Sequence, residues 1–173
     1  FSGALDINPG APVKTISSIG KEDIYLLRLD KTGLFSWGFS LGSQENDIGS
    51  QVASDSLGNI ILAGNFTGSV DFDPSANIDT LITSSSDMDC FLAKFDSAGN
   101  YIWSRSIEGE GIDYPTSVAM NDLGKIFLGG AFASDSINFN PVQGKHMVKK
   151  KGWIDSFVLK LNADGSFSDV QTY

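Results

Sequence analysis

One pattern recurs along this chain at a constant spacing of 66 residues. Residues 23–37 align with residues 89–103 and again with residues 155–169, and residues 52–66 align with residues 118–132. A further motif, Phe followed by Asp-x-Asx-Pro or a near equivalent, begins at positions 1, 66 and 132. The 173 residues therefore hold about 2.6 repeats. A fixed period of this kind predicts structural units that share their cores with their neighbours.

The repeated segments predict β-strands joined by tight turns. In residues 90–95 the side chains alternate, so that Phe91, Ala93 and Phe95 share one apolar face of a strand. Each predicted strand pair is joined by Asp or Asn followed three residues later by glycine, which is hairpin chemistry. Sustained helical periodicity is absent. The sequence predicts an all-β fold with positive φ at five turn glycines, namely Gly33, Gly58, Gly99, Gly124 and Gly165.

The pattern resembles a known propeller repeat. From Asp89 the chain reads Asp-x-Phe-Leu-Ala-Lys-Phe-Asp-x-x-Gly-Asn-x-x-Trp, and from Ser117 it reads Ser-Val-Ala-x-Asn-x-x-Gly-x-Ile-x-Leu-x-Gly-x-Phe. These stretches resemble the SBBP β-propeller repeats of large secreted bacterial proteins, notably of the Bacteroidetes type. The resemblance covers two full copies and one partial copy, in which Asp169 replaces the tryptophan. It implies blades of four antiparallel strands, a secreted or cell-surface location, and type IX secretion.

The repeat count predicts an incomplete ring. We expect one propeller segment over residues 1–173, with units at approximately 1–65, 66–131 and, in part, 132–173. A closed propeller needs at least about four blades, so this chain is expected to belong to a larger propeller. The abrupt start on a repeat motif favours a mature or truncated product. Expected partners are the remainder of a longer polypeptide or other protein subunits, with glycans left open.

Charge and composition exclude several classes of partner. The chain has 12 Lys and Arg against 21 Asp and Glu, which gives a formal net charge of −9. This balance argues against binding to nucleic acid or to an anionic membrane surface. The longest apolar runs are far shorter than the ~20 residues of a membrane span, so membrane insertion is not expected. With Cys90 as the single cysteine, no internal disulfide can form, which fits a cytosolic protein or a disulfide-free secreted one.

Catalytic and cofactor-binding residues are not assigned. The single histidine, His146, lies in the basic stretch 145–151 and is expected in an exposed connector. A Gly-x-Ser-x-Gly elbow and a glycine-rich phosphate loop are both missing. Cys90 is expected to fill space among apolar neighbours and not to react.

One pair of acids is a weak candidate for a calcium site. Asp71 and Asp73 are two apart in a predicted strand, so both carboxylates could reach one hard cation. In the other two copies of this motif asparagine replaces one or both acids. An acid before proline is also ordinary turn chemistry. We therefore assign no metal ligand and no cofactor, with calcium at Asp71 and Asp73 as the open alternative.

The residues that recur in every copy have two interpretations. They could form a ring of ligand-binding groups, or they could tie blade to blade through hydrogen bonds to the backbone, which we favour. The charged members of this set are Asp23, Asp89, Asp155, Arg28, Lys94 and Lys160. Trp37 and Trp103 are expected in the core, whereas Trp153 falls outside the repeat and is expected to be an idiosyncratic, exposed aromatic. Burial is predicted for Phe91, Phe95, Leu27, Leu159 and Trp103.

A modification signal accompanies the Bacteroidetes resemblance. Triplets of Asp, Ser or Thr, and an aliphatic residue resemble the O-glycosylation motif of that group. The candidate acceptors are Ser56, Thr80, Ser97 and Ser136. Such short triplets also arise by chance, and two of them coincide with turns.

These observations favour a non-enzymatic propeller segment. The leading hypothesis is an extracellular or cell-surface scaffold, or a module that binds proteins or glycans. One alternative is the propeller domain of a secreted carbohydrate-active enzyme, which would need paired acids or a comparable cluster. The other is secretion cargo with a purely structural role.

Overall fold

The computed structural model describes residues 1–83, 86–140, 142 and 144–173. In this part of the chain every regular element is a β-strand, so the all-β prediction is confirmed, and no helix is long and apolar enough to cross a membrane. The strands are β1 (Ala4–Asp6), β2 (Thr15–Ser17), β3 (Ile24–Leu29), β4 (Phe35–Leu41), β5 (Ile48–Ser54), β6 (Ile60–Phe66), β7 (Ser69–Asp71), β8 (Thr80–Ile82), β9 (Asp89–Phe95), β10 (Tyr101–Gly109), β11 (Asp113–Met120), β12 (Ile126–Phe132), β13 (Ser136–Asn138), β14 (Met147–Lys149), β15 (Asp155–Leu161) and β16 (Phe167–Thr172).

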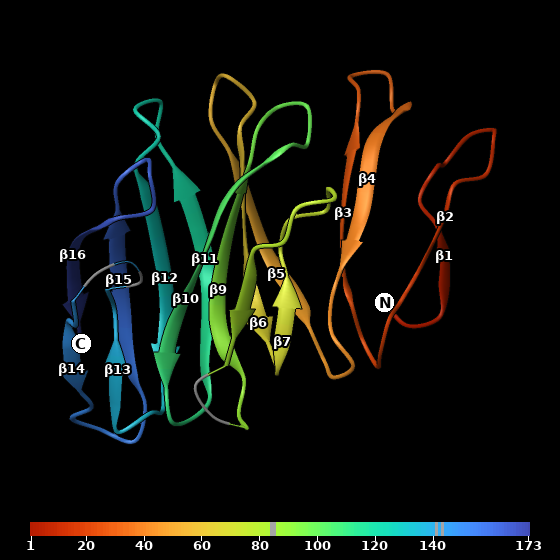
Figure 1. Ribbon diagram of the computed structural model, residues 1–173. Coiled ribbons are helices and arrows are strands. Elements are labelled where there is room, and N and C mark those ends of the chain that lie inside the picture. The colour runs from red at the N-terminus through yellow and green to blue at the C-terminus, as the bar shows by residue number, and fades with distance from the viewer. Residues whose placement is uncertain (84–85, 141, 143) are drawn as a thin grey trace.

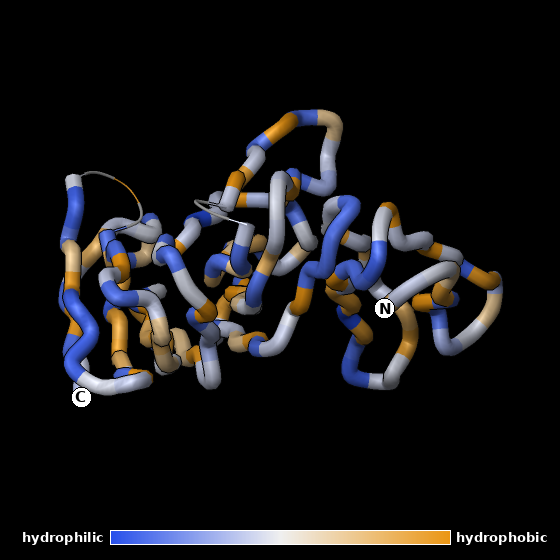
Figure 2. Tube along the Cα trace, turned by 90° about the horizontal axis from the view of Figure 1, so that it is seen from below, coloured by the Kyte–Doolittle hydropathy of each residue, from blue (hydrophilic) through white to orange (hydrophobic). Residues whose placement is uncertain are grey.

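The long strands form propeller-like blades. Strands β5, β6, β9 and β10 are antiparallel neighbours that make the middle blade, and β13 and β14 extend this sheet to six strands beyond β10. Strands β11, β12, β15 and β16 make a four-stranded antiparallel sheet, the C-terminal blade. Strands β3 and β4 form a two-stranded sheet. Figure 1 shows these sheets side by side in chain order, and Figure 2 shows the two termini at opposite ends of the row. Each blade joins hairpins from two successive repeats, so it spans the boundary at 65/66 or 131/132.

The turns follow from the Asp-x-x-Gly sequence. At the β5–β6 turn, the backbone N–H of Gly58 donates to the carbonyl oxygen of Asp55 at 3.0 Å. One carboxylate oxygen of Asp55 accepts from the backbone N–H groups of Leu57 and Asn59 at 3.0 and 2.9 Å. The five turn glycines have φ between 72° and 86°, which confirms the predicted positive φ.

A small hairpin forms at each copy of the Phe…Asp-x-Asx-Pro motif. These hairpins are β1–β2, β7–β8 and β13–β14, and they add short strands that the sequence analysis did not predict to the four strands of each blade. The first Asp or Asn of the motif explains the tight fold: Asp71 accepts from the N–H groups of Asp73 at 3.1 Å and Asp79 at 2.9 Å. The next residue, Phe72 or Phe139, points inward and is fully buried. Pro141 of the third copy lies outside the described residues.

The β13–β14 hairpin connects the two blades. Strand β13 pairs with β10, which belongs to the preceding blade, through Glu108 opposite Asn138 and Gly109 opposite Ile137. The ring of Phe139 packs against Phe132 and Phe157 of the C-terminal blade, with centroids 5.8 and 4.9 Å apart. The β13–β14 hairpin therefore inserts an apolar wedge, Phe139, between the middle and C-terminal blades.

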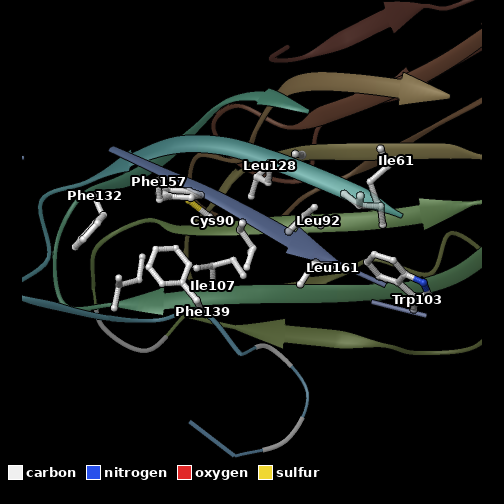
Figure 3. Close-up of a cluster of buried hydrophobic side chains, with 14 residues drawn as sticks. Ile61, Cys90, Leu92, Trp103, Ile107, Leu128, Phe132, Phe139, Phe157 and Leu161 are labelled. Carbon is white, nitrogen blue, oxygen red and sulfur yellow. The ribbon is translucent and has the colours of Figure 1, made fainter. Parts of the chain in front are cut away.

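Two apolar cores lie between the sheets. One joins the middle and C-terminal blades and includes Cys90, Leu92 and Trp103 on one side with Leu128 and Phe157 on the other (Figure 3). The second joins β3–β4 to the middle blade and includes Ile24, Leu26, Leu62 and Phe91. Strand β9 lies between the two cores, and all seven of its residues are buried.

Four of the five burial predictions are confirmed. Phe91, Phe95, Leu159 and Trp103 are buried, with at most 6% of the surface exposed. The prediction for Leu27 was wrong, because this residue is only half-buried. Leu27 lies on the face of β3 that points away from the middle blade, and neither of the two blades among the described residues covers that face.

The wedge role of Phe139 predicts a large loss of stability on truncation. Phe139→Ala should lower the free energy of unfolding by about 3–5 kcal/mol, because it opens a cavity in the core between two blades. Unfolding in urea, followed by tryptophan fluorescence, measures this change. Leu123→Ala, at a side chain 78% exposed, is the control and should change stability by less than about 0.5 kcal/mol. A change below about 1 kcal/mol for Phe139→Ala would show that the hairpin is not packed as described.

Candidate functional site

Two of the three recurring cations, Arg28 and Lys94, and the recurring tryptophans bind the backbone of the next sheet, whereas the ammonium group of Lys160 lies over the ring of Phe127. Arg28 and Trp37 both donate to the carbonyl oxygen of Ser97, at 2.8 and 3.2 Å. One repeat later, Lys94 and Trp103 both donate to the carbonyl oxygen of Ala163, at 3.0 and 3.2 Å. Both acceptors lie in Asp-x-x-Gly or Asn-x-x-Gly turns. These side chains therefore link one blade to the next.

The recurring aspartates hold loops of their own sheets. Asp23 accepts from the backbone N–H of Ile19 at 2.8 Å. Asp155 accepts from Lys151 and Gly152 at 2.8 and 2.9 Å, and Asp89 accepts from Gly109 at 3.5 Å. The aspartates and these two cations thus have different partners, although both sets bind the backbone.

Two further buried acids repeat at the same spacing, and the sequence reasoning did not single them out. Asp47 accepts from the N–H groups of Ser43 at 2.6 Å and Thr67 at 3.1 Å. Asp113 accepts from the N–H of Ser134 at 3.1 Å and from its hydroxyl at 2.5 Å. Burial raises the pKa of both carboxyl groups. The sequence contains a signal for them, because Asp47 and Asp113 are separated by one repeat length of 66 residues.

The candidate calcium pair takes part in turn hydrogen bonding. Asp71 accepts from two backbone N–H groups of its own hairpin, and Asp73 accepts from the N–H of Ser75 at 2.9 Å. Among the residues that the structure describes, no group of three or more His, Cys, Asp or Glu side chains is placed to hold a metal ion. Calcium at Asp71 and Asp73 stays a sequence-based prediction.

The remaining candidates for chemistry or modification lie in different strands, turns and loops. Cys90 is fully buried, and burial raises the pKa of its thiol well above the usual value. His146 is exposed and stacks on Phe167 with centroids 4.6 Å apart. The structure places the glycosylation candidates Ser56, Thr80 and Ser97 on the surface and Ser136 half-buried. Modification of these four residues stays a prediction.

A groove follows the edge of β3 that faces away from β4. It consists of two adjoining hollows between β3 and β5, of about 540 and 350 Å³. Both hollows are lined by Leu26, Leu27 and Val52, and Val52 is 60% exposed. Phe1 lies at one end and Arg28 at the other. We call this feature the β3 edge groove.

An exposed apolar and basic loop precedes β15. Trp153 is 95% exposed and Ile154 is 54% exposed. The same loop carries Lys150, which lies 3.3 Å from a carboxylate oxygen of Asp135, and the exposed Lys151. The prediction that Trp153 is an exposed aromatic is confirmed. We call residues 150–154 the Trp153 loop.

Comparison with known proteins supports the repeat architecture. The chain is 27% identical over 158 residues to the uncharacterized WD repeat-containing protein L264 of Acanthamoeba polyphaga mimivirus, a match that covers 87% of this chain and 11% of that protein. It is 29% identical over 167 residues to the regulatory protein FlaEY of Caulobacter vibrioides, covering 95% of this chain and 16% of that protein. Protein-family models give no match to the chain.

These relatives are much longer than this chain, which spans less than a fifth of either. WD repeats build propeller blades of four strands. The similarity and the sheet topology together support a repeat protein with propeller-like all-β blades.

Burial of Asp113 predicts a specific dependence of stability on pH. Because the pKa is raised in the folded state, the folded protein retains a proton that the unfolded chain has already released. The bound proton stabilises the folded state at low pH. Its contribution to the free energy of unfolding falls as the pH rises from about 4 through the raised pKa of Asp113. Asp113→Asn stays neutral throughout. The free energy of unfolding of the wild type minus that of Asp113→Asn should therefore be larger at pH 4 than at pH 7, as measured by urea unfolding.

Asp96→Asn is the matched control for this measurement. Hydrogen bonds from the side chain and backbone of Asn100 lower the pKa of Asp96, so its contribution is lost as the pH falls. The free energy of unfolding of the wild type minus that of Asp96→Asn should thus be smaller at pH 4 than at pH 7. Equal slopes for the two variants would contradict the role given to burial at Asp113.

Proposed function

We propose that this chain is a segment of a β-propeller that acts as a non-enzymatic interaction module for proteins or glycans. The resemblance of its repeats to SBBP sequences supports a secreted or cell-surface location in a bacterial protein. The similarity to a protein named for WD repeats supports the interaction role. We propose this role for the segment alone, since the chain spans a small part of its relatives.

The Trp153 loop carries this proposal. Tryptophan is enriched among the residues that dominate binding energy at protein interfaces, and a side chain 95% exposed contributes little to the fold. The repeat equivalent of Trp153 is Asp87, so the shared architecture does not require an aromatic side chain at this position. The exposed Lys151 adds local positive charge to an acidic chain, which favours an acidic partner surface.

The hydrogen bonds of the recurring polar residues agree with a role other than catalysis. Asp23, Arg28, Lys94 and Asp155 each bind a backbone group, as described above. A side chain held in this way stabilises turns and interfaces between blades. The proposal therefore places function on surface loops and assigns the repeated positions to structure.

Truncation of Trp153 tests the proposed function. Partners captured from the native host by the wild-type chain, and glycans bound on an array, are identified first, and their affinities are then measured by titration. Trp153→Ala should weaken binding at least about 30-fold, the loss of about 2 kcal/mol typical of a central interface residue. Thermal stability should stay unchanged.

Leu57→Ala is the matched control, because Leu57 is 76% exposed but lies at a β-turn. This variant should bind as the wild type does. Equal affinity of Trp153→Ala and wild type would reject the Trp153 loop as the binding surface. Turnover of a polysaccharide by the chain would favour the alternative of a carbohydrate-active enzyme.

A further inference from the structure

A hollow of about 470 Å³ lies beside the β7–β8 hairpin, and we call it the hairpin pocket. It is lined by β4, by the loop that joins β7 to β8, and by the turn between β9 and β10. All of this lining lies between positions 39 and 101, so sheets of the described chain flank it. Its volume is typical of small-molecule sites, which occupy about 300–1,000 Å³. The lining includes two aromatic and four polar side chains, namely Phe39, Tyr101, Asp73, Ser75, Asn77 and Asn100.

The two aromatic rings of the hairpin pocket are held by the core. The ring of Phe39 stacks on Trp37 with centroids 5.7 Å apart, and it lies 5.2 Å from Phe95. The ring of Tyr101 meets Phe95 edge-on at 6.1 Å. Phe39 and Tyr101 are both half-buried and pack against the core between the β3–β4 sheet and the middle blade. The pocket therefore has two apolar walls that are ordered before a ligand binds, which lowers the entropic cost of binding.

In the first and third copies of the repeat, the ring equivalent to Tyr101 is covered by a side chain. The ammonium group of Lys14 lies over the ring of Phe35, 4.9 Å from its centroid. The imidazole of His146 stacks on Phe167 with centroids 4.6 Å apart. Lys14 and His146 occupy equivalent places, because the backbone N–H of each donates to the first Asp or Asn of its hairpin motif at 3.0 Å.

Asp79 occupies this place in the second copy, and it binds differently. Its backbone N–H donates to Asp71 at 2.9 Å, as in the other two copies. Its carboxylate, however, accepts from the hydroxyl of Tyr101 at the edge of the ring. The same hydroxyl lies 2.9 Å from the side-chain oxygen of Ser104. A contact at the ring edge thus replaces the contact over the ring face, and Tyr101 lines the hairpin pocket instead.

Phe39 is a second departure from the repeat at the same pocket. Its counterpart one repeat later is Arg105, which donates to the backbone carbonyl oxygen of Asp164 at 3.2 Å. The second copy therefore has an apolar ring where the third has a cation bound to a turn. Since the shared architecture requires neither Phe39 nor the arrangement of Asp79 and Tyr101, both features point to a role specific to this copy.

Polar groups with spare hydrogen-bonding capacity surround the two rings. One carboxylate oxygen of Asp73 accepts from the N–H of Ser75 at 2.9 Å. Among the described residues, the other oxygen of Asp73 and the side-chain amide of Asn77 form no hydrogen bond. The amide nitrogen of Asn100 donates to Asp96 at 2.8 Å, which leaves its carbonyl oxygen to accept from a ligand.

This combination of groups fits a sugar. A pyranose ring presents C–H groups on its faces and hydroxyl groups around its edge, so aromatic rings pack on the faces and carboxylate or amide groups bind the hydroxyls. Each hydroxyl both donates and accepts, which suits a carboxylate beside an amide. The carboxylates of Asp73 and Asp79 disfavour a ligand with negative charge. A neutral sugar is therefore favoured over an acidic one.

We propose that the hairpin pocket binds one pyranose unit of a neutral glycan. The sugar packs on the rings of Tyr101 and Phe39. Its hydroxyl groups bind the side chains of Asp73, Asn77 and Asn100. The pocket is separate from the Trp153 loop, so this inference goes beyond the proposed function and does not rest on it.

Methyl glycosides of glucose, galactose and mannose are the probes. They are titrated into the isotope-labelled wild-type chain, and binding is followed through the backbone amide shifts in the NMR spectrum. We expect saturable shifts at Asn77, Asn100 and Tyr101 with at least one glycoside, and a dissociation constant on the order of 1 mM, typical of a ligand with so few atoms. The absence of saturable shifts with all three glycosides, or shifts confined to other residues, would overturn the proposal.

Two substitutions of Asp79 test the open ring face. Asp79→His copies the third copy of the repeat, so its imidazole should stack on Tyr101, cover the ring and weaken binding at least about tenfold. Asp79→Asn can still accept from the hydroxyl of Tyr101 and leaves the ring face open, so it should bind within about twofold of the wild type. Thermal unfolding checks that both variants are folded. Equal affinities of these two variants would contradict the assigned role of the ring.

Two charged ligands and one distant variant complete the test. Methyl glucuronoside should bind more weakly than methyl glucoside, and the reverse order would contradict the preference for a neutral sugar. Saturable shifts at the pocket with tetramethylammonium but with none of the glycosides would assign the pocket to a cation and overturn the proposal. Trp153→Ala should bind the glycosides as the wild type does, so failure of sugar binding and failure of the proposed interaction role are distinguishable.

Discussion

Burial of apolar sheet faces against neighbouring sheets is the interaction on which this structure depends. Strand β9 is buried along its whole length because sheets lie on both of its sides, whereas β3 and β15 each expose one face. Burying one large apolar side chain contributes about 1.5–3 kcal/mol, and each of the two cores contains ten or more such groups. An exposed ion pair such as Lys21–Glu45 contributes at most about 1 kcal/mol. Packing between blades therefore dominates stability.

Polar groups contribute more to the relative position of neighbouring blades than to the stability of their packing. Arg28 and Lys94 each reach a turn carbonyl of the next sheet, and a tryptophan binds the same oxygen. A net hydrogen bond from a charged donor contributes about 1.5–3 kcal/mol, comparable to one buried side chain. Its geometry is far more restrictive than that of an apolar contact. The bonds therefore fix the register between neighbouring blades, while the buried aspartates hold the loops at the other end of the strands.

The recurring polar residues and the Trp153 loop arise from opposite features of a repeat protein. Arg28 and Lys94 bind turn carbonyl groups at equivalent places in successive copies, so comparison of the copies explains their role. The Trp153 loop exists because one copy departs from the pattern, and nothing in the other copies predicts its partner. In such a chain, structural sites recur at the spacing of the repeat, whereas an individual binding site lies where one copy differs from the others.

The sequence by itself determined the all-β class, the turns and most of the buried strand positions, because alternation and Asp-x-x-Gly chemistry act over a few residues. It also predicted the exposure of Trp153 from a break in the repeat. Only the tertiary structure decided that a blade joins hairpins from two repeats. It also decided that Phe72 and Phe139 are fully buried and that Leu27 is only half-buried. These features depend on which sheet lies beside which, and a local pattern that recurs in every copy carries no information about the sheet beside it.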